Sequence, residues 1–172
     1  MITAGLIRPY KRIPEIVEVF TEYEDAEASL TIVGRPASVA IGDDLHDRSK
    51  GDDRVSLRLD YVSDQELLSA LASSDLVILN YEKFENSGIA LMALSVGTPI
   101  LLPRSASSEA LLDEFGDALV SLFDGNLSAE DIRDALLASP SLLGDGNPPM
   151  PLREWPHIAG QYSRVYVGES VR

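Results

Sequence analysis

The stretch "YEKFENSGIALMALSVGTPILLP", residues 81 to 103, decides the fold of this chain. It contains neither His nor Cys, but it joins a helix that begins at Ser87-Gly88 to a buried strand entered through Gly97-Thr98-Pro99. A Gly followed by Thr-Pro is typical of a helix stop and a turn, and "TPILLP" is a short apolar strand. A helix that leads directly into an apolar strand is part of the repeating unit of a parallel α/β sheet.

The same alternation of helix and strand continues along the rest of the chain. Strands are predicted at residues 2–7, 29–34, 54–62, 74–81, 98–103 and 117–123. Helices are predicted at residues 13–20 and 107–116, after the N-cap residues Ser63 and Ser128, and from Ser87-Gly88 onward, with Ser63 and Glu66 forming a capping box. This order predicts a doubly wound (Rossmann-like) parallel sheet of about six strands with helices on both faces. A C-terminal crossing helix is predicted in "REWPHIAGQYSRVY", which contains Trp155, His157 and Tyr162.

Composition restricts the classes of function. The 172 residues, 45% of them hydrophobic, suit a single globular domain. A net charge of −14 with scattered basic residues argues against a nucleic-acid partner. The absence of cysteine, of a long apolar run and of a signal-like start predicts a cytoplasmic protein with no transmembrane segment. Peripheral docking of a longer form of the protein at the inner face of the membrane is compatible with this expectation.

The start of the helix at Ser87-Gly88 is the first candidate site. Ligands of doubly wound sheets bind beyond the carboxyl ends of the strands, and free N–H groups at a helix start attract phosphate. Asn86 and Ser87 can cap the helix or contact the ligand, and Lys11 in "RPYKR" can reach the same anion. The alternative is an ordinary helix cap and a solvated basic turn.

The order and spacing of several segments resemble a known enzyme family. Over essentially the whole chain they are similar to the nucleotide-sugar-binding C-terminal half of GT-B fold glycosyltransferases of the glycogen-synthase-like group, family four. The segments are "GLIRPYKRIPEIVEVF", "LTIVGRP", "RVSLRLDYVSDQELLSALASSDLVILNY", "NSGIALMALSVGTPILLP" and "REWPHIAGQYSRVY".

The resemblance implies a role for individual residues. It assigns the donor diphosphate to Lys11 and to the helix start at Ser87 and Gly88, with Arg8 as an auxiliary charge because Leu6 stands where the family has Arg. It places the base and ribose beside three successive residues, Asp60, Tyr61 and Val62.

The family's Glu-x7-Glu motif is not kept. Counted back from Gly97, its two positions are Phe84 and Met92, and a shift by one gives Glu85 and Ala93. Methionine cannot replace a carboxylate as a ribose ligand, so the ribose contacts must differ. Glu85, or Glu82 if the loop bulges, is the candidate contact to the donor sugar, and no residue is assigned with certainty to catalysis.

The resemblance also implies a function and a domain organisation. The expected donor is a UDP- or GDP-linked sugar, transferred with retention of configuration and without a metal or other cofactor. Residues 1–172 would form the donor-binding half of a two-domain enzyme whose N-terminal acceptor-binding domain is absent. Alone, the chain is then expected to bind nucleotide sugar without turnover.

A noncatalytic α/β module is the alternative from another class. It would be a degenerate nucleotide-binding copy or a receiver-like signalling domain, with Asp60 at the end of the third strand as the only receiver-like feature. The acidic segment 42–53, with His46, offers possible metal ligands, but it is expected to be a solvated linker.

Overall fold

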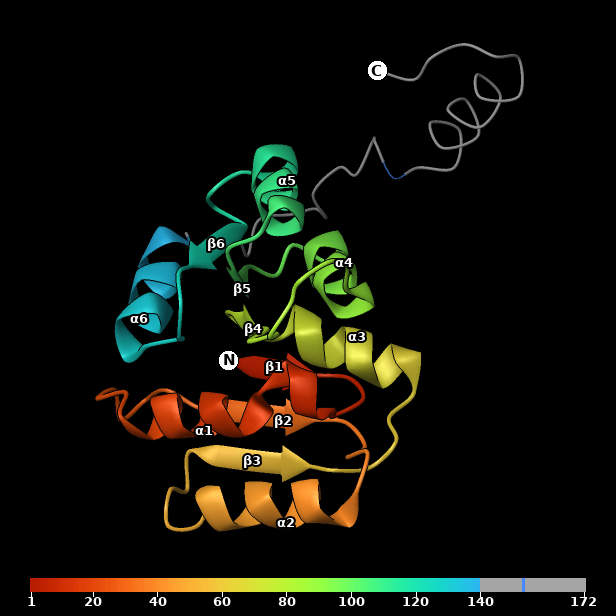
Figure 1. Ribbon diagram of the computed structural model, residues 1–172, viewed down its shortest axis with the longest axis vertical. Helices are drawn as coiled ribbons and strands as arrows, with labels where there is room; N and C mark the ends of the chain where they lie inside the picture. The colour runs from red at the N-terminus through yellow and green to blue at the C-terminus, as the bar shows by residue number, and fades with distance from the viewer. Residues whose placement is uncertain (140–152, 154–172) are drawn as a thin grey trace.

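The computed structural model describes residues 1–139 and 153, and its centre is a sheet of six parallel strands (Figure 1). The strands are β1 (Ile2–Ala4), β2 (Leu30–Val33), β3 (Val55–Arg58), β4 (Val77–Ile78), β5 (Ile100–Pro103) and β6 (Val120–Phe123). Their order in the sheet is β3-β2-β1-β4-β5-β6. Because the chain order reverses between β1 and β4, the loops after these two strands border the crevice where ligands of this fold bind.

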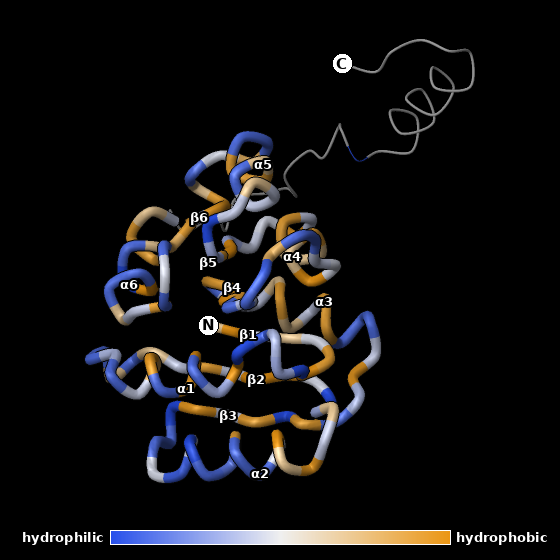
Figure 2. Tube along the Cα trace, viewed as in Figure 1, coloured by the Kyte–Doolittle hydropathy of each residue, from blue (hydrophilic) through white to orange (hydrophobic). Residues whose placement is uncertain are grey.

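Helices connect the strands and cover both faces of the sheet, as predicted. They are α1 (Ile13–Thr21), α2 (Val39–Arg48), α3 (Asp64–Ala72), α4 (Gly88–Ser95), α5 (Ala106–Phe115) and α6 (Ala129–Ala138), preceded by the short 3-10 helix η1 (Pro9–Lys11). One apolar cluster joins the sheet to α3, α4 and α5, and the other joins it to α1, α2 and α6. Adjacent strand residues contribute to opposite clusters, as Val77 and Ile78 do. The central strands β1, β4 and β5 are therefore almost fully buried, whereas the edge strand β3 alternates half-buried and exposed residues (Figure 2).

Local sequence signals set the helix boundaries. Ser63 and Glu66 form the predicted capping box of α3, and Ser87 and Ser128 cap α4 and α6. Gly97 ends the α4 turn with φ of 77°, a conformation that favours glycine. The hydroxyl of buried Thr98 donates to the carbonyl of Leu71 at 2.9 Å, so the Gly-Thr-Pro sequence also fixes the end of α3.

Some predicted elements differ in the structure. Most of the expected acidic linker belongs to α2, in which only Leu45 is buried and the other apolar residues are grouped in the first turn, so its periodicity is weak. The strand predicted at residues 2–7 ends at Ala4, because Gly5 has φ of 96°. The strand predicted at residues 74–81 is reduced to Val77–Ile78. The predicted terminal helix with Trp155, His157 and Tyr162 lies outside the described residues.

The strand order decides between the two α/β topologies considered. Receiver domains have the order 2-1-3-4-5, whereas this sheet has β1 between β2 and β4. The receiver-like alternative was therefore wrong on topology.

None of the helices in the described part of the chain has the length and hydropathy needed to cross a bilayer.

Candidate functional site

The loops after β1 and β4 are held together at the crevice by three contacts. The backbone N–H of Glu82 donates to the carbonyl of Tyr10 at 2.8 Å. The buried side-chain amide of Asn80 donates to the carbonyl of Arg12 at 3.3 Å. The rings of Tyr10 and Tyr81 meet edge to face with centroids 5.8 Å apart. These contacts fix η1, which carries Lys11, relative to the loop that leads into α4.

Lys11 is a buried cation at this crevice. Its side chain is only 7% exposed, and within residues 1–139 and 153 no carboxylate forms an ion pair with it. Burial, assisted by the nearby positive charge of Arg8, lowers the pKa of Lys11 to about 8. A buried ammonium without a negative partner is costly, and an anionic ligand would relieve that cost.

The start of α4 offers unpaired backbone donors next to this cation. The Ser87 hydroxyl accepts from the N–H of Ala90 at 3.3 Å, while the N–H groups of Gly88 and Ile89 have no acceptor among the described residues. A Cβ on Gly88 would point into open space. A Cβ on Gly5 would lie 3.1 Å from both the Lys11 Nζ atom and the Ile89 Cγ1 atom, so the ammonium and a side chain of the first turn of α4 meet on the same side of this glycine.

Tyr81 lies between these two groups of donors. It is 6% exposed, and its hydroxyl is 3.2 Å from the Ser87 hydroxyl. The Lys11 Nζ atom lies 5.3 Å from the centroid of the Tyr81 ring, and the Phe84 ring packs on Tyr81 at 5.9 Å. Burial raises the pKa of Tyr81, so its phenol stays protonated and can donate to Ser87.

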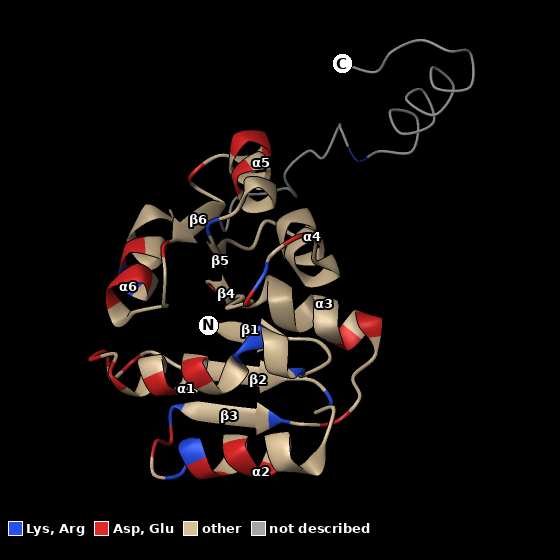
Figure 3. Cartoon of the chain, viewed as in Figure 1, with Lys and Arg blue, Asp and Glu red and all other residues tan. Residues whose placement is uncertain are grey.

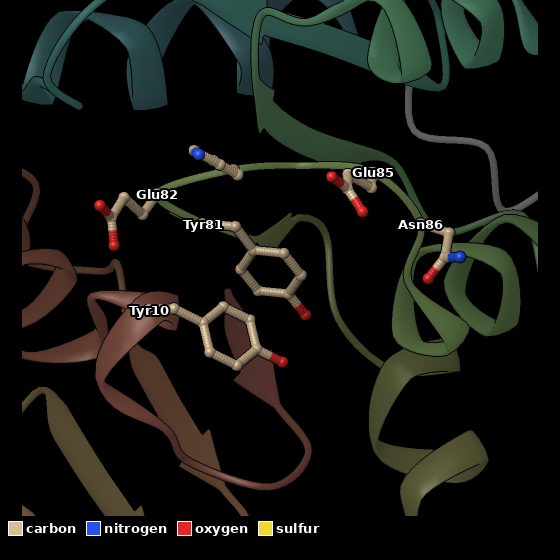
Figure 4. Close-up of a pocket in the computed structure, with 6 residues that line it drawn as sticks. Tyr10, Tyr81, Glu82, Glu85 and Asn86 are labelled. Atoms are coloured by element: carbon tan, nitrogen blue, oxygen red, sulfur yellow. The ribbon is translucent and has the colours of Figure 1, made fainter.

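A pocket of about 400 Å³ opens beside this cluster. It is lined by Tyr10, Tyr81, Glu82, Lys83, Glu85 and Asn86. Figure 4 shows the two tyrosine rings next to each other, with Glu82 on one side and Glu85 and Asn86 on the other. An aromatic wall with carboxylate and amide groups at its rim can bind a hydroxyl-rich ring through stacking and hydrogen bonds.

The predicted site residues fall into two groups. Arg8, Lys11, Asn86, Ser87 and Gly88 come from the two loops at the crevice, and Glu85 lies at the rim of the pocket.

The residues predicted to surround the base and ribose follow β3, at the same carboxyl edge of the sheet but farther along it. Tyr61 is 81% exposed there, Asp60 is exposed, and half-buried Val62 packs against the cluster that includes α3 and α4. These three residues do not line the pocket beside Tyr10.

The structure explains two departures from the family motif. Phe84 is buried and contributes its ring to Tyr81 and its carbonyl to the Ser105 hydroxyl, so it belongs to the core. Met92 is partly buried against the cluster of α3, α4 and α5. Glu85 is exposed beside Phe84 and remains the carboxylate at this end of the loop.

The charge distribution distinguishes the crevice from the rest of the surface. The chain carries a net charge of −14, yet Arg8, Lys11 and Arg12 gather in and around η1, and Lys83 lies in the loop before α4 (Figure 3). In the described part of the chain, no three residues of the His, Cys, Asp or Glu types are grouped as metal ligands.

Sequence reasoning missed Gly5, Asn80 and Tyr81. Gly5 directly follows an apolar strand, and a glycine in that place can signal a close approach of other groups to the backbone. Asn80 is polar at the end of a buried strand, where it needs a hydrogen-bond partner. Nothing in the local pattern around Tyr81 indicates its contacts, because these come from η1 and from the cap of α4.

The fold is similar to that of glycosyltransferase domains of known structure. The C-terminal domain of a group 1 family glycosyltransferase (LpcC) from Francisella tularensis superposes with a TM-score of 0.64 at 18% identity, over 78% of this chain and 71% of that chain. Anabaena Alr3699/HepE in complex with UDP-glucose gives 0.63 at 14% identity, over 79% of this chain and 37% of that one. These similarities establish the architecture.

Sequence similarity leads to a particular relative. The chain is 34% identical over 166 residues to the GDP-mannose:glycolipid 4-beta-D-mannosyltransferase of Xanthomonas campestris pv. campestris. The match covers 95% of this chain and 47% of that protein, so the chain spans about half the length of this curated relative. No protein-family model matches the chain.

Proposed function

We propose that this chain is the donor-binding half of a glycosyltransferase that transfers a sugar from a UDP- or GDP-linked donor to an acceptor. The single observation that carries the proposal is that the Lys11 ammonium and the Ile89 side chain meet at Gly5, which brings the cation to the first turn of α4, where the N–H groups of Gly88 and Ile89 have no acceptor among the described residues. In this proposal the diphosphate occupies the space in front of these donors, and Arg8 adds positive charge.

The chemistry of sugar transfer needs the groups that this crevice supplies. Departure of a nucleoside diphosphate places negative charge on phosphate oxygens, and prearranged N–H groups and a cation stabilise that charge. The transfer requires no nucleophilic side chain of this chain. The Lys11 ammonium and the α4 amides bind the leaving group, and the pocket beside Tyr10 and Glu85 receives the sugar.

The relatives also suggest which sugar nucleotide is the donor. The Xanthomonas relative is named for GDP-mannose, and the Anabaena structure contains UDP-glucose. Because the relative is 34% identical and the Anabaena protein only 14%, GDP-mannose is the first donor to test. Asp60, Tyr61 and Val62 are proposed to surround the base and ribose.

The stereochemical course can be tested separately. The resemblance to the glycogen-synthase-like group implies retention, whereas the name of the Xanthomonas enzyme specifies a β-linked mannoside. From an α-linked sugar nucleotide, retention gives an α-glycoside and inversion gives a β-glycoside. In the product of a two-domain enzyme that contains this chain, the one-bond carbon–hydrogen coupling at the anomeric centre distinguishes them, and a β product would overturn retention.

The main test measures nucleotide binding to the 172-residue chain by isothermal titration calorimetry with GDP, UDP and ADP. We expect GDP or UDP to bind and Lys11→Met to weaken that binding roughly ten- to a hundredfold, the range for loss of one charge-assisted contact of about 1.5–3 kcal/mol. Lys50→Met is the matched control, because Lys50 is an exposed lysine at the end of α2, away from the crevice. It removes the same charge and should leave the affinity unchanged.

Two results would contradict the proposal. If the parent chain binds none of the three nucleotides, the nucleotide-binding role is wrong. If Lys11→Met and Lys50→Met weaken binding equally, the effect is one of net charge and the crevice is not the site.

A further inference from the structure

We infer that Tyr81 is a positioning residue that holds the Lys11 ammonium against the start of α4, so that the two act as one diphosphate site. The inference rests on the proposed function and extends it to a residue that acts on the diphosphate site through Lys11 and Ser87. Tyr81 is the side chain that contacts both halves of the site, Lys11 through its ring and Ser87 through its hydroxyl.

The contact with Lys11 uses the face of the ring. The Nζ atom lies 5.3 Å from the ring centroid, within the range in which an aromatic ring attracts a cation. Since no carboxylate of the described residues pairs with Lys11, this ring is its main attractive neighbour in the free protein. The ring therefore favours the orientation in which the ammonium faces Gly5 and Ile89.

The contact with α4 uses the phenol. The Tyr81 and Ser87 hydroxyl oxygens are 3.2 Å apart, and Ser87 also accepts from the N–H of Ala90. Either hydroxyl can be the donor in this contact, and in both cases the Ser87 oxygen is held in place as the cap. The side chain that orients the cation thus also fixes the position of the helix start.

Neighbouring contacts leave Tyr81 little freedom to move. Phe84 and Tyr10 pack on its ring, and the main-chain bond from Glu82 to Tyr10 ties its own loop to η1. The phenol is 6% exposed, so solvent competes little for its hydrogen bond. Tyr81 is thus held rigidly enough to position both groups.

A double-mutant cycle tests the inference with GDP and UDP as probes. We expect Tyr81→Leu to weaken binding about tenfold and Tyr81→Phe, which keeps the ring, about two- to fivefold. In a Lys11→Met background the same substitutions should have smaller effects, because the cation that Tyr81 positions is gone. Fully additive effects would overturn the inference.

Tyr23→Leu is the matched control for loss of a buried tyrosine. Tyr23 is 7% exposed and stacks on Phe20 after the end of α1, away from the crevice. Its replacement should lower the free energy of unfolding and leave nucleotide affinity unchanged. If Tyr23→Leu weakens binding as much as Tyr81→Leu, the effect of Tyr81 is general destabilisation, and the inference is wrong.

A second readout does not depend on nucleotide binding. After reductive methylation with ¹³C-formaldehyde, the Lys11 methyl signal should be shifted upfield by the Tyr81 ring relative to exposed Lys50 and Lys83. Tyr81→Leu should remove that shift, and Tyr81→Phe should keep it. An unshifted Lys11 signal in the parent refutes the contact, whereas a shifted signal without any nucleotide binding refutes the proposed function alone.

Discussion

Gly34 shows how a single residue can determine the geometry of the crevice. Its φ is 142°, and a Cβ at this position would lie 2.0 Å from the carbonyl oxygen of Gly5. The N–H of Gly5 donates to the carbonyl of Val33 at 2.9 Å, so the turns after β1 and β2 are in direct backbone contact. Gly5 in turn lies against Lys11 and Ile89. The close approach of Gly34 to Gly5 therefore helps to set the position of the backbone on which the proposed anion site is built.

We expect Gly34→Ala to lower the free energy of unfolding by roughly 2–4 kcal/mol, because it combines backbone strain with a clash against main-chain atoms. Gly51→Ala is the matched control: Gly51 also has a positive φ, 92°, but no atom lies within 4 Å of its Cβ position. Strain alone should cost about 1 kcal/mol there. Urea denaturation measures both values, and equal losses would show that the contact with Gly5 is unimportant.

The lowered pKa of Lys11 predicts proton uptake on binding. Above pH 8 the amine is mostly neutral in the free protein, and a bound diphosphate favours its protonated form. At pH 8.5, calorimetry in buffers of different ionisation enthalpy should show uptake of up to one proton, which should vanish in Lys11→Met. At pH 6.5 Lys11 contributes no uptake because it is already charged. Equal uptake by parent and variant at pH 8.5 would contradict this assignment.

The lowered pKa of Lys11 also makes the free energy of unfolding depend on pH, and the direction of this dependence is opposite to that for a lysine in an ion pair. The unfolded lysine, with a pKa near its ordinary value of 10.5, binds more protons than the folded one between pH 8 and 10.5. The contribution of Lys11 to the free energy of unfolding therefore increases as pH rises through this window. A lysine stabilised by a carboxylate would show the reverse.

At the scale of the element, α4 combines a structural cap with free donors. Ser87 satisfies the N–H of Ala90, while Gly88 leaves the space in front of the first amides open. Glycine is not required there by the fold, because a Cβ would meet no atom within 4 Å and Gly88 has no positive φ. The open space is therefore available to a ligand.

Gly88→Ala should change the free energy of unfolding by less than about 1 kcal/mol, since alanine suits a helix at least as well as glycine. It should nevertheless weaken GDP or UDP binding, because the new methyl group occupies the space proposed for the diphosphate. Gly42→Ala in α2 is the matched control, with its Cβ in ordinary contact 3.6 Å from Pro36. Chemical denaturation and calorimetry measure both effects. Unaltered affinity in Gly88→Ala would remove the α4 amides from the proposed site.

At the scale of the whole molecule, we propose that the chain provides the donor side of the reaction. It matches 47% of the length of its mannosyltransferase relative, and the proposed phosphate-binding groups follow the central strands β1 and β4. In GT-B enzymes of the group that the sequence resembles, the acceptor enters from a second domain.

We therefore expect the 172-residue chain to bind nucleotide without producing glycoside. Incubation with GDP-mannose or UDP-glucose and a glycolipid acceptor should release no nucleotide above the enzyme-free rate. A chimera in which this chain replaces the matching half of the Xanthomonas enzyme provides the positive arm. Robust transfer by the isolated chain would contradict the domain organisation proposed here.

The sequence by itself determined the layered α/β fold. The apolar runs, the serine caps of α3, α4 and α6, and the buried stripe Ile13, Ile16, Val17 and Phe20 of α1 are local signals, and the structure confirms them. It also located the start of α4 and pointed to Lys11, because glycine, serine and lysine after apolar strands are visible one segment at a time. Helix α2 was not predicted, because a helix with one fully buried residue lacks a clear apolar period.

Only the tertiary structure decided how these segments meet. Leu30–Val33 pairs with β1, and Val77–Ile78 pairs with β1 on its other side, which creates the crevice. Gly34 approaches Gly5, which is 29 positions earlier in the chain, and Tyr81 contacts Lys11, which is 70 positions earlier. Such contacts depend on how helices and loops pack around the sheet. A local sequence pattern does not encode that packing, because the packing partners of each side chain come from distant segments of the chain.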